Sequence, residues 1–443
     1  MPILSKEDAQ ALLKKVLSYS KADECEVSLR GNDGGNIRTA LNAVSTAGDI
    51  STVSLFVNSV FGKKSGTATI NEFDDASLEK VVRRAEELAQ LAPANPERMP
   101  MLGPQKFEDS IEYNATTAAV TPESRAEMVG KALEVTKAAN LQAAGFLENT
   151  TRFTAVMNSK GLFAYDKSTD VIFSVTTRDA PGSISGYAAR GFTDVTKLDT
   201  ASATRIASQK ALSSKNARAI EPGKYTVILE PVAATYMLEN MFRFDARSAE
   251  EGRSFLSKKG GGTRLGEKLM DDKVTIYSDP FNPELPGATW TNEGERQEKT
   301  YWIQNGVVKN LSYSRYWAQK KGVPSMPGPS NIIMEGGTTS LEDMIKSTER
   351  GILVSRLWYI RLVDPQSLLL TGLTRDGTYY IENGKIMFPV KNFRFNESPV
   401  IMLNNVEALG KPERSISVES YRSYLIPPMK IRDFTFTSLS DAV

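Results

Sequence analysis

The sequence of 443 residues contains no histidine and a single cysteine, Cys25, and these two counts restrict what the chain can form. One cysteine cannot make an intrachain disulfide, and it cannot supply the several thiolates of an iron–sulfur or multi-cysteine metal site. Without imidazole there can be no Ser-His-Asp triad, no Cys-His dyad and no zinc site with histidine ligands. Most common hydrolase mechanisms are therefore excluded, and a reducing compartment, the cytoplasm, is the expected location.

The N-terminal part has the pattern of a small α/β domain. Apolar residues at helical spacing predict helices over 4–19 and 75–91. Alternation of apolar and polar residues predicts strands over 24–30 and 52–60. We expect the two strands to be neighbours in one sheet, with the second helix packed on it.

A proline-rich segment separates this part from the next. The prolines and the weak periodicity between 92 and 122 predict a linker or surface connection. Beyond it we expect helices over 122–140 and 198–213, with short alternating strands over 153–179 between them.

From residue 224 onward, short strands separated by turns become the dominant pattern. Residues 225–231 predict a strand, and 232–255 predict a largely helical segment. Asn305-Gly306 and Asn383-Gly384 each lie between two apolar runs. Because Asn-Gly supplies the positive φ angles of a two-residue type I′ turn, both sites predict β-hairpins.

Together these patterns predict an α+β fold. A sandwich-like N-terminal α/β domain is expected over 1–95 and a linker over 96–122. A mixed α/β middle region is expected over 123–220, and a strand-rich C-terminal domain over 221–443.

The charge and hydropathy of the chain argue against two classes of partner. Its 54 basic and 53 acidic side chains leave a net charge of +1, which gives no overall field to attract nucleic acid. No window approaches the ~18 uninterrupted apolar residues of a membrane span. We therefore expect neither direct nucleic-acid binding nor membrane insertion.

Four features could carry chemistry, but each has a simpler structural explanation. The glycine-rich stretch 255–264 lacks phosphate-loop spacing and is expected to be a helix C-terminus with a cationic last turn. Cys25 is expected to be a buried small hydrophobe. The aromatic and basic segment 313–321 predicts a partly buried helix with a basic exposed end. Solvated faces are expected for the acidic pairs Asp74-Asp75, Glu250-Glu251 and Asp271-Asp272.

Several segments, taken in their order and spacing, resemble the TldD/PmbA family, whose members are often called modulators of DNA gyrase. In the N-terminal part the resemblance lies in Ala22-Asp-Glu-Cys-Glu-Val and Phe61-Gly-Lys-Lys-Ser-Gly-Thr-Ala. Further on it lies in Gly266-Glu-Lys, Asn292-Glu-Gly-Glu-Arg-Gln, Asn305-Gly-Val-Val-Lys-Asn and Gly377-Thr-Tyr-Tyr-Ile-Glu-Asn-Gly-Lys-Ile-Met-Phe-Pro-Val-Lys.

In that family one subunit type, TldD, resembles a metallopeptidase with a His-Glu-x-x-x-His motif on the helix that opens the C-terminal domain. The second type, TldE or PmbA, lacks the motif and pairs with the first. The matching segment of this chain, 239–253, offers no zinc ligand in either of two alignments, and the family's C-terminal cysteine is absent from 415–421. An arginine at the metal position would also repel Zn²⁺. The degenerate motif region comprises Phe242, Arg243, Asp245, Arg247, Ser248 and Glu251.

The resemblance implies a TldE-like, non-catalytic subunit of a two-component peptidase that processes unfolded or modified peptides. It implies no catalytic residue, metal ligand or cofactor in this chain, with zinc in a TldD-like partner, and a heterodimer or homodimer. Alone, the chain is expected to be inactive. The alternative is a stand-alone peptide-binding or gyrase-modulating protein. A third hypothesis is a metal-independent hydrolase that uses carboxylates such as Asp245 and Glu251.

Overall fold

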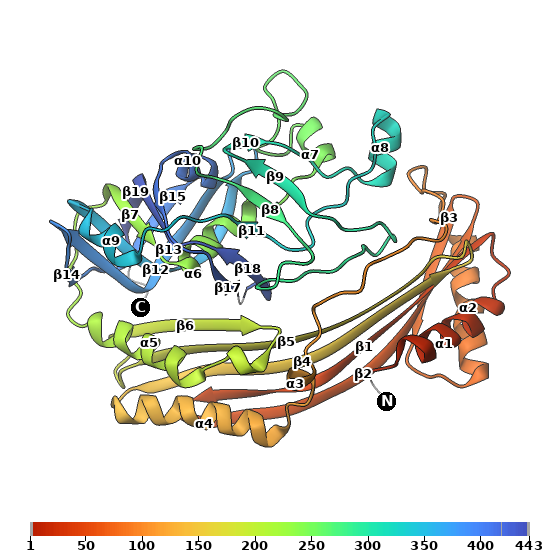
Figure 1. Cartoon of the computed structure of the whole chain (residues 1–443), viewed down its shortest axis with the longest axis horizontal. Helices are drawn as coiled ribbons and strands as arrows, with labels where there is room; N and C mark the ends of the chain where they lie inside the picture. Colours follow the sequence, from red (N-terminus) through yellow and green to blue (C-terminus); the bar gives the residue numbers. More distant parts are fainter. Residues whose placement is uncertain (1–2, 418, 441–443) are drawn as a thin grey trace.

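The computed structural model describes residues 3–417 and 419–440, which form two layers (Figure 1). A long antiparallel sheet with helices on one side makes one layer, and the strands that follow residue 221 make the other. Helices and strands are segregated in this way rather than alternating along one parallel sheet, so the predicted α+β class is confirmed.

In the described part of the chain, the first sheet has six strands in the order β3-β2-β1-β4-β5-β6. Strands β1 and β2 pair from Glu24↔Val60 to Ala40↔Ala43. The two predicted strands are therefore neighbours, but both are much longer than predicted. The strand bounds are β1 Glu24–Ala40, β2 Ala43–Phe61, β3 Lys64–Ile70, β4 Gln142–Asn158, β5 Phe163–Arg178 and β6 Ser185–Phe192.

The central pairing of this sheet joins segments that are far apart in the sequence. Strand β1 pairs with β4 from Glu26↔Asn158 to Thr39↔Gly145. This second ladder keeps the Gly- and Asn-rich half of β1 extended, although that half lacks the alternation of a typical strand. One sheet thus contains strands from both 1–95 and 123–220, and the domain boundaries stay a prediction.

Helices cover the side of this sheet that faces away from the C-terminal strands (Figure 1). On β5, Val171 and Phe173 pack into the core beneath α4 and α5, while Ile172 packs into the C-terminal core, as period-2 alternation requires. The predicted helices are confirmed. The bounds are α1 Lys6–Ser18, α2 Asp75–Leu91, α3 Ala115–Ala118, α4 Pro122–Ala138, the 3-10 turn η1 Val195–Lys197 and α5 Thr200–Ser213.

Two glycines let helices lie directly on the sheet. A Cβ atom at Gly66 on β3 would lie 2.2 Å from the backbone nitrogen of Ala89 in α2. A Cβ atom at Gly186 on β6 would lie 2.0 Å from the carbonyl oxygen of Ala207 in α5. These separations are far below van der Waals contact, so only glycine fits at either position.

The largest C-terminal sheet has the order β12-β7-β19-β15-β13-β14, and β13 also pairs with β12. The path therefore closes on itself as a small barrel. Phe393, Phe395, Phe434 and Phe436 are buried and contact one another in its core. The bounds are β7 Gly223–Leu229, β12 Arg350–Asp364, β13 Leu369–Glu382, β14 Lys385–Pro389, β15 Phe393–Glu397, β19 Met429–Leu439 and β16 Val406–Leu409, which pairs with β19.

A second C-terminal sheet lies beside this barrel in Figure 1, and its strands β17 and β18 are the ones nearest to the first sheet. Its order is β10-β9-β8-β11-β18-β17. Its strands are β8 Ile276–Ser278, β9 Thr300–Gln304, β10 Val307–Val308, β11 Ile333–Met334, β17 Glu413–Ser417 and β18 Arg422–Ile426. The helices of this half are α6 Pro231–Leu238, the 3-10 turn η2 Glu239–Met241, α7 Ala246–Glu250, α8 Arg315–Lys321, α9 Leu341–Lys346 and α10 Pro399–Asn404.

Both predicted hairpins are confirmed. Asn305 and Gly306 have φ angles of 49° and 76° between β9 and β10, and Asn383 and Gly384 have 48° and 75° between β13 and β14. The predicted helix over 313–321 is also confirmed as α8, with Trp317 buried and its last two lysines exposed. Cys25 is fully buried, as predicted.

Three other predictions are wrong in extent or type. The strands within 153–179 are not short, because β4 and β5 are 17 and 16 residues long. The segment 232–255 breaks into α6, η2 and α7, since the chain leaves helical geometry at Phe242 and Asp245 caps a new helix. The stretch 255–264 follows a loop rather than a helix, and it turns back on itself through a bridge between Ser257 and Thr263.

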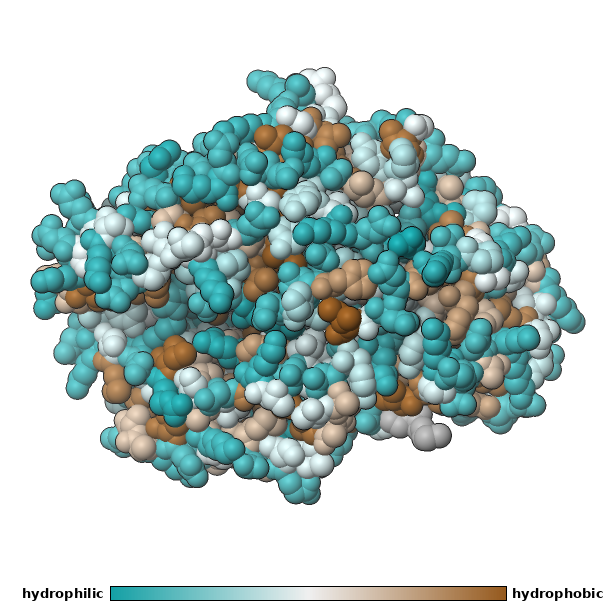
Figure 2. Space-filling view, in the orientation of Figure 1, coloured by the Kyte–Doolittle hydropathy of each residue, from teal (hydrophilic) through white to brown (hydrophobic). Residues whose placement is uncertain are grey.

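The surface in Figure 2 is mostly hydrophilic, and its apolar residues form small separated groups on that face. Within residues 3–417 and 419–440, none of the helices combines the length and the hydropathy that crossing a membrane requires.

Candidate functional site

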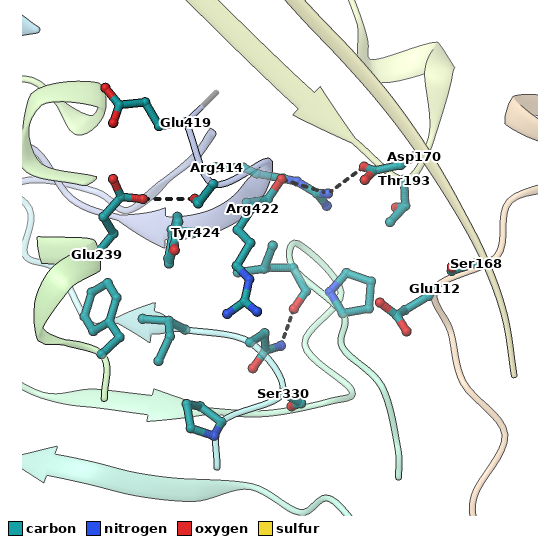
Figure 3. A pocket seen from close by; sticks show the side chains of 18 of the residues that line it. Glu112, Ser168, Asp170, Thr193, Glu239, Ser330, Arg414, Glu419, Arg422 and Tyr424 are labelled. Carbon is teal, nitrogen blue, oxygen red and sulfur yellow. Dashed lines mark hydrogen bonds and ion pairs between the residues drawn. The ribbon is translucent and has the colours of Figure 1, made fainter. Parts of the chain in front are cut away.

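A cleft of about 940 Å³ lies between the first sheet and the C-terminal strands (Figure 3). Strands β4 and β5 form one wall. The opposite wall consists of the turn 239–243, the segment 329–332, and residues of β12, β17 and β18. The lining is strongly polar and contains five arginines, Arg152, Arg243, Arg361, Arg414 and Arg422, and four carboxylic acids, Glu112, Asp170, Glu239 and Glu419.

A partly buried ion pair joins the two walls. Nη2 of Arg414 on β17 lies 3.7 Å from Oδ1 of Asp170 on β5, and the Arg414 side chain is only 8% exposed. Burial raises the pKa of the Asp170 carboxyl, whereas the Arg414 charge lowers it. Arg152 approaches the other carboxylate oxygen of Asp170 at 3.8 Å. The Arg414–Asp170 pair therefore ties the C-terminal half of the chain to the first sheet inside the cleft.

A second acidic group lies at the end of the linker. Burial, together with the neighbouring Asp166 charge, raises the pKa of Glu112 to about 8. The backbone N–H of Thr169 on β5 donates to the Glu112 carbonyl oxygen at 3.1 Å, which holds the linker against this strand. Glu112 therefore carries a proton at neutral pH, and it adds little negative charge to the cleft.

The turn that follows α6 forms the opposite side. Ser420 donates to Oε2 of Glu239 at 2.9 Å, and burial raises the pKa of Glu239. The Phe242 ring packs on Tyr424 of β18 with 5.5 Å between ring centroids. This aromatic contact fixes the turn against β18 and places Arg243 at the rim of the cleft.

The structure separates the six residues of the degenerate motif region. Phe242 and Arg243 line the cleft, but Asp245 instead accepts the backbone N–H of Ser248 as the N-cap of α7. Arg247 makes two hydrogen bonds to Glu97, at 2.8 and 3.0 Å, and a third to Glu251 at 3.0 Å. The last four residues therefore stabilise α7 and its contact with the linker rather than facing the cleft.

These residues do not fit a zinc ion. The ring of Phe242 has no lone pair to donate, and the guanidinium of Arg243 is always protonated, so neither can bind Zn²⁺. Ser415 and Ser417, in the segment where the family carries a cysteine, are buried hydroxyls rather than thiols. No group of three His, Cys, Asp or Glu side chains suited to a metal occurs in the part of the chain that the structure describes.

The acidic pairs have mixed environments. Asp74 caps α2, and its partner Asp75 is exposed beside Lys15, in keeping with a solvated face. Glu250, in contrast, is only 15% exposed and pairs with Lys321 of α8, so the prediction of a solvated face is wrong for this residue.

Sequence reasoning missed most of the cleft. Glu112, Asp170, Arg414 and Arg422 come from three distant segments, and none belongs to a recognisable motif. The sequence signal that could have found two of the cleft residues is the alternation of side chains along a strand. Arg422 and Tyr424 are two residues apart on one strand and so lie on the same side of it.

Three sequence profiles of one family match consecutive parts of the chain. They are described as the PmbA/TldA metallopeptidase domain 1, the central domain and the C-terminal domain, and they match residues 25–89, 108–215 and 222–438. Together they extend over nearly all of the described residues.

Individual relatives agree with this result. An uncharacterized protein of Methanocaldococcus jannaschii is 28% identical over 225 residues, which are 45% of this chain and 50% of that protein. The metalloprotease PmbA of Escherichia coli O157:H7 is 27% identical over 172 residues, which are 38% of this chain and 37% of that protein. The chain thus aligns with half or less of the length of these curated relatives.

The fold matches a solved structure over its full length. TldE from Thermococcus kodakarensis superposes with a TM-score of 0.84 at 19% identity, covering 98% of this chain and 100% of that one. At this identity the likeness shows the fold alone. Because all three family domains are matched in order along the sequence, the chain belongs to the PmbA/TldD metallopeptidase family.

Proposed function

We propose that this protein is the non-catalytic subunit of a two-component, TldD/TldE-type metallopeptidase, and that its cleft helps to hold an unfolded or modified peptide. The observation that carries the proposal is the cleft wall at the degenerate motif. There the chain presents the ring of Phe242 and the guanidinium of Arg243 instead of metal ligands. A cytoplasmic location is part of this proposal.

The chemistry of this wall supports binding rather than hydrolysis. A zinc-bound water needs a cation held by lone-pair donors, whereas Arg243 places a permanent positive charge at the rim. The packed Phe242 and Tyr424 rings and the partly buried Arg414–Asp170 pair give the cleft a fixed shape without a metal. A preformed cleft of this kind suits a subunit that orients a substrate while another subunit cleaves it.

The two carboxylates considered for a metal-independent hydrolase, Asp245 and Glu251, are poorly placed for hydrolysis. Asp245 is engaged as a helix cap, and Glu251 is paired with Arg247 and Arg253, so neither faces the cleft. These contacts do not support a metal-independent hydrolysis by the two acids.

The test begins with the tagged full-length chain purified from its source cells, with mass-spectrometric identification of the proteins that accompany it and a zinc assay. We expect a family member that carries His-Glu-x-x-x-His in near-stoichiometric amount, together with zinc. The two proteins are then assayed separately and mixed, on an unstructured fluorogenic peptide.

We expect hydrolysis by the mixture, none by this chain alone, and none when the motif glutamate of the second protein is replaced by glutamine. Zinc and hydrolysis in the isolated chain would overturn the proposal. Failure to recover any family member, with no effect of this chain on the hydrolysis by a recombinant one, would favour the stand-alone binding protein.

A further inference from the structure

Two of the five cleft arginines have no carboxylate partner among the residues that the structure describes. Arg243 and Arg422 are exposed to the cleft, and neither makes an ion pair or a side-chain hydrogen bond with any other described residue. The other three arginines each have a carboxylate within 4.0 Å: Arg152 and Arg414 approach Asp170, and Arg361 approaches Glu419. The unpaired cations are thus confined to one wall.

The fold places these two cations on the same wall of the cleft. Arg422 and Tyr424 lie on the same side of β18, because side chains two residues apart share one face of a strand. Phe242 packs on Tyr424, and Arg243 is the next residue in the chain. Figure 3 shows Arg422 reaching from β18 into the middle of the cleft. The aromatic contact therefore holds both arginines on one wall.

The acids of the cleft offset only part of the positive charge of its five arginines. The partly buried Glu112 is protonated below about pH 8, and Asp170 already faces two arginines. Glu239 accepts a hydrogen bond from Ser420, and burial raises its pKa. The cleft therefore has an excess of positive charge, and its walls concentrate the resulting field on a bound anion.

We propose that Arg243 and Arg422 form a subsite that binds the carboxylate of an extended peptide, an inference that rests on the proposed peptide-binding role of the cleft. Guanidinium groups bind carboxylates through parallel, charge-assisted hydrogen bonds. The neighbouring rings of Phe242 and Tyr424 supply an apolar surface for the side chain beside that carboxylate. The carboxylate comes either from the C-terminus of the peptide or from an acidic side chain.

The test uses fluorescence anisotropy with the full-length chain and a labelled, unstructured peptide without Asp or Glu. The peptide is prepared with a free C-terminal carboxylate and with a C-terminal amide, and a third, amidated version contains one internal Glu. The variants are Arg243→Gln and Arg422→Gln. Because both arginines are exposed and make no ion pair within the described residues, these changes should leave the fold intact, which circular dichroism verifies.

A matched control is Arg432→Gln, since Arg432 is also exposed but lies outside the cleft lining. We expect a carboxylate-bearing peptide to bind about tenfold more tightly than its uncharged amide, the effect of one charge-assisted contact. Each cleft variant should reduce this preference, whereas Arg432→Gln should keep it. A preference for the free terminus assigns the subsite to the peptide end, and a preference for the internal Glu assigns it to a side chain.

Equal affinity for charged and uncharged peptides, no detectable binding of either, or a preference that survives both cleft variants would overturn the inference. This outcome is separable from the fate of the proposed function. A carboxylate preference in a chain that associates with no catalytic partner would keep the subsite and remove the peptidase role. If the chain associates with an active partner but shows no carboxylate preference, the peptidase role is kept and the subsite is removed.

Discussion

The strands β12 and β13 are joined by a buried ion pair. Breaking this pair should make the stability of the protein depend on pH. Nη1 of Arg356 lies 2.7 Å from Oδ2 of Asp376, with side-chain exposures of 7% and 1%. The guanidinium also lies 3.7 Å above the ring of Tyr187 on β6, so the pair supports the contact between the two layers. The perturbation is Arg356→Met, which removes the charge and keeps an apolar side chain.

The cost of this change follows from the carboxyl group that is left behind. A buried carboxylate without its partner avoids the full desolvation penalty by taking up a proton. Protonating an aspartic acid with an ordinary pKa near 4 costs about 4 kcal/mol at pH 7 and about 1.5 kcal/mol at pH 5. These figures are upper limits, because Arg375 remains 3.9 Å from the same carboxylate.

The assay is urea unfolding at pH 5 and pH 7, followed by tryptophan fluorescence. The protonated carboxyl is favoured in the folded variant, so the variant loses stability as the pH rises. We expect Arg356→Met to be destabilised by roughly 2 kcal/mol more at pH 7 than at pH 5. The double variant Arg356→Met/Asp376→Asn should lose this pH dependence. Asparagine suits the control because position 376 has a φ of 55°, which asparagine tolerates. A cost that is the same at both pH values, or a pH dependence that persists in the double variant, would refute the reasoning.

Three further expectations concern single positions. Burial raises the pKa of Glu112 from its ordinary value of 4.5 to about 8. Between these two pH values the folded protein keeps a proton that the unfolded chain releases. The protein should therefore lose stability as the pH rises from 4.5 to 8. Glu112→Gln should flatten the fall of Tm from pH 5 to pH 8 in thermal scans. Gly66→Ala should destabilise the protein by about 1–3 kcal/mol in urea unfolding, because its Cβ would overlap the backbone of α2. Cys25 is buried with a raised pKa, so a thiol reagent should label it only in denaturant; rapid labelling of native protein would contradict its position.

Much of the fold could be predicted because its signals are local. The helix over 75–91 was located to the residue, since Asp74 supplies a cap and the apolar face is regular. The hairpins at 305–306 and 383–384 follow from the conformational preference of Asn-Gly alone. The length of β1 could not be predicted, because its Gly- and Asn-rich half is held by pairing with β4, more than a hundred residues away.

The candidate site was harder to predict because it, too, depends on contacts between segments that are far apart in the sequence. The resemblance directed attention to 239–253, but only Phe242 and Arg243 of the six named residues line the cleft. Helical periodicity suggested a continuous segment there, whereas the chain breaks at Phe242 to pack its ring on Tyr424. The remaining charges of the cleft are brought together only by the packing of the two layers, which no local pattern encodes.

The most direct test of the central claim is peptide hydrolysis by this chain, by a family member carrying His-Glu-x-x-x-His, and by the two together, with zinc measured in each sample. Our account predicts that zinc and activity belong to the second protein, and that adding this chain increases its activity on an unstructured peptide. Zinc-dependent hydrolysis by this chain alone, or activity of the second protein that is unchanged by its presence, would contradict the account.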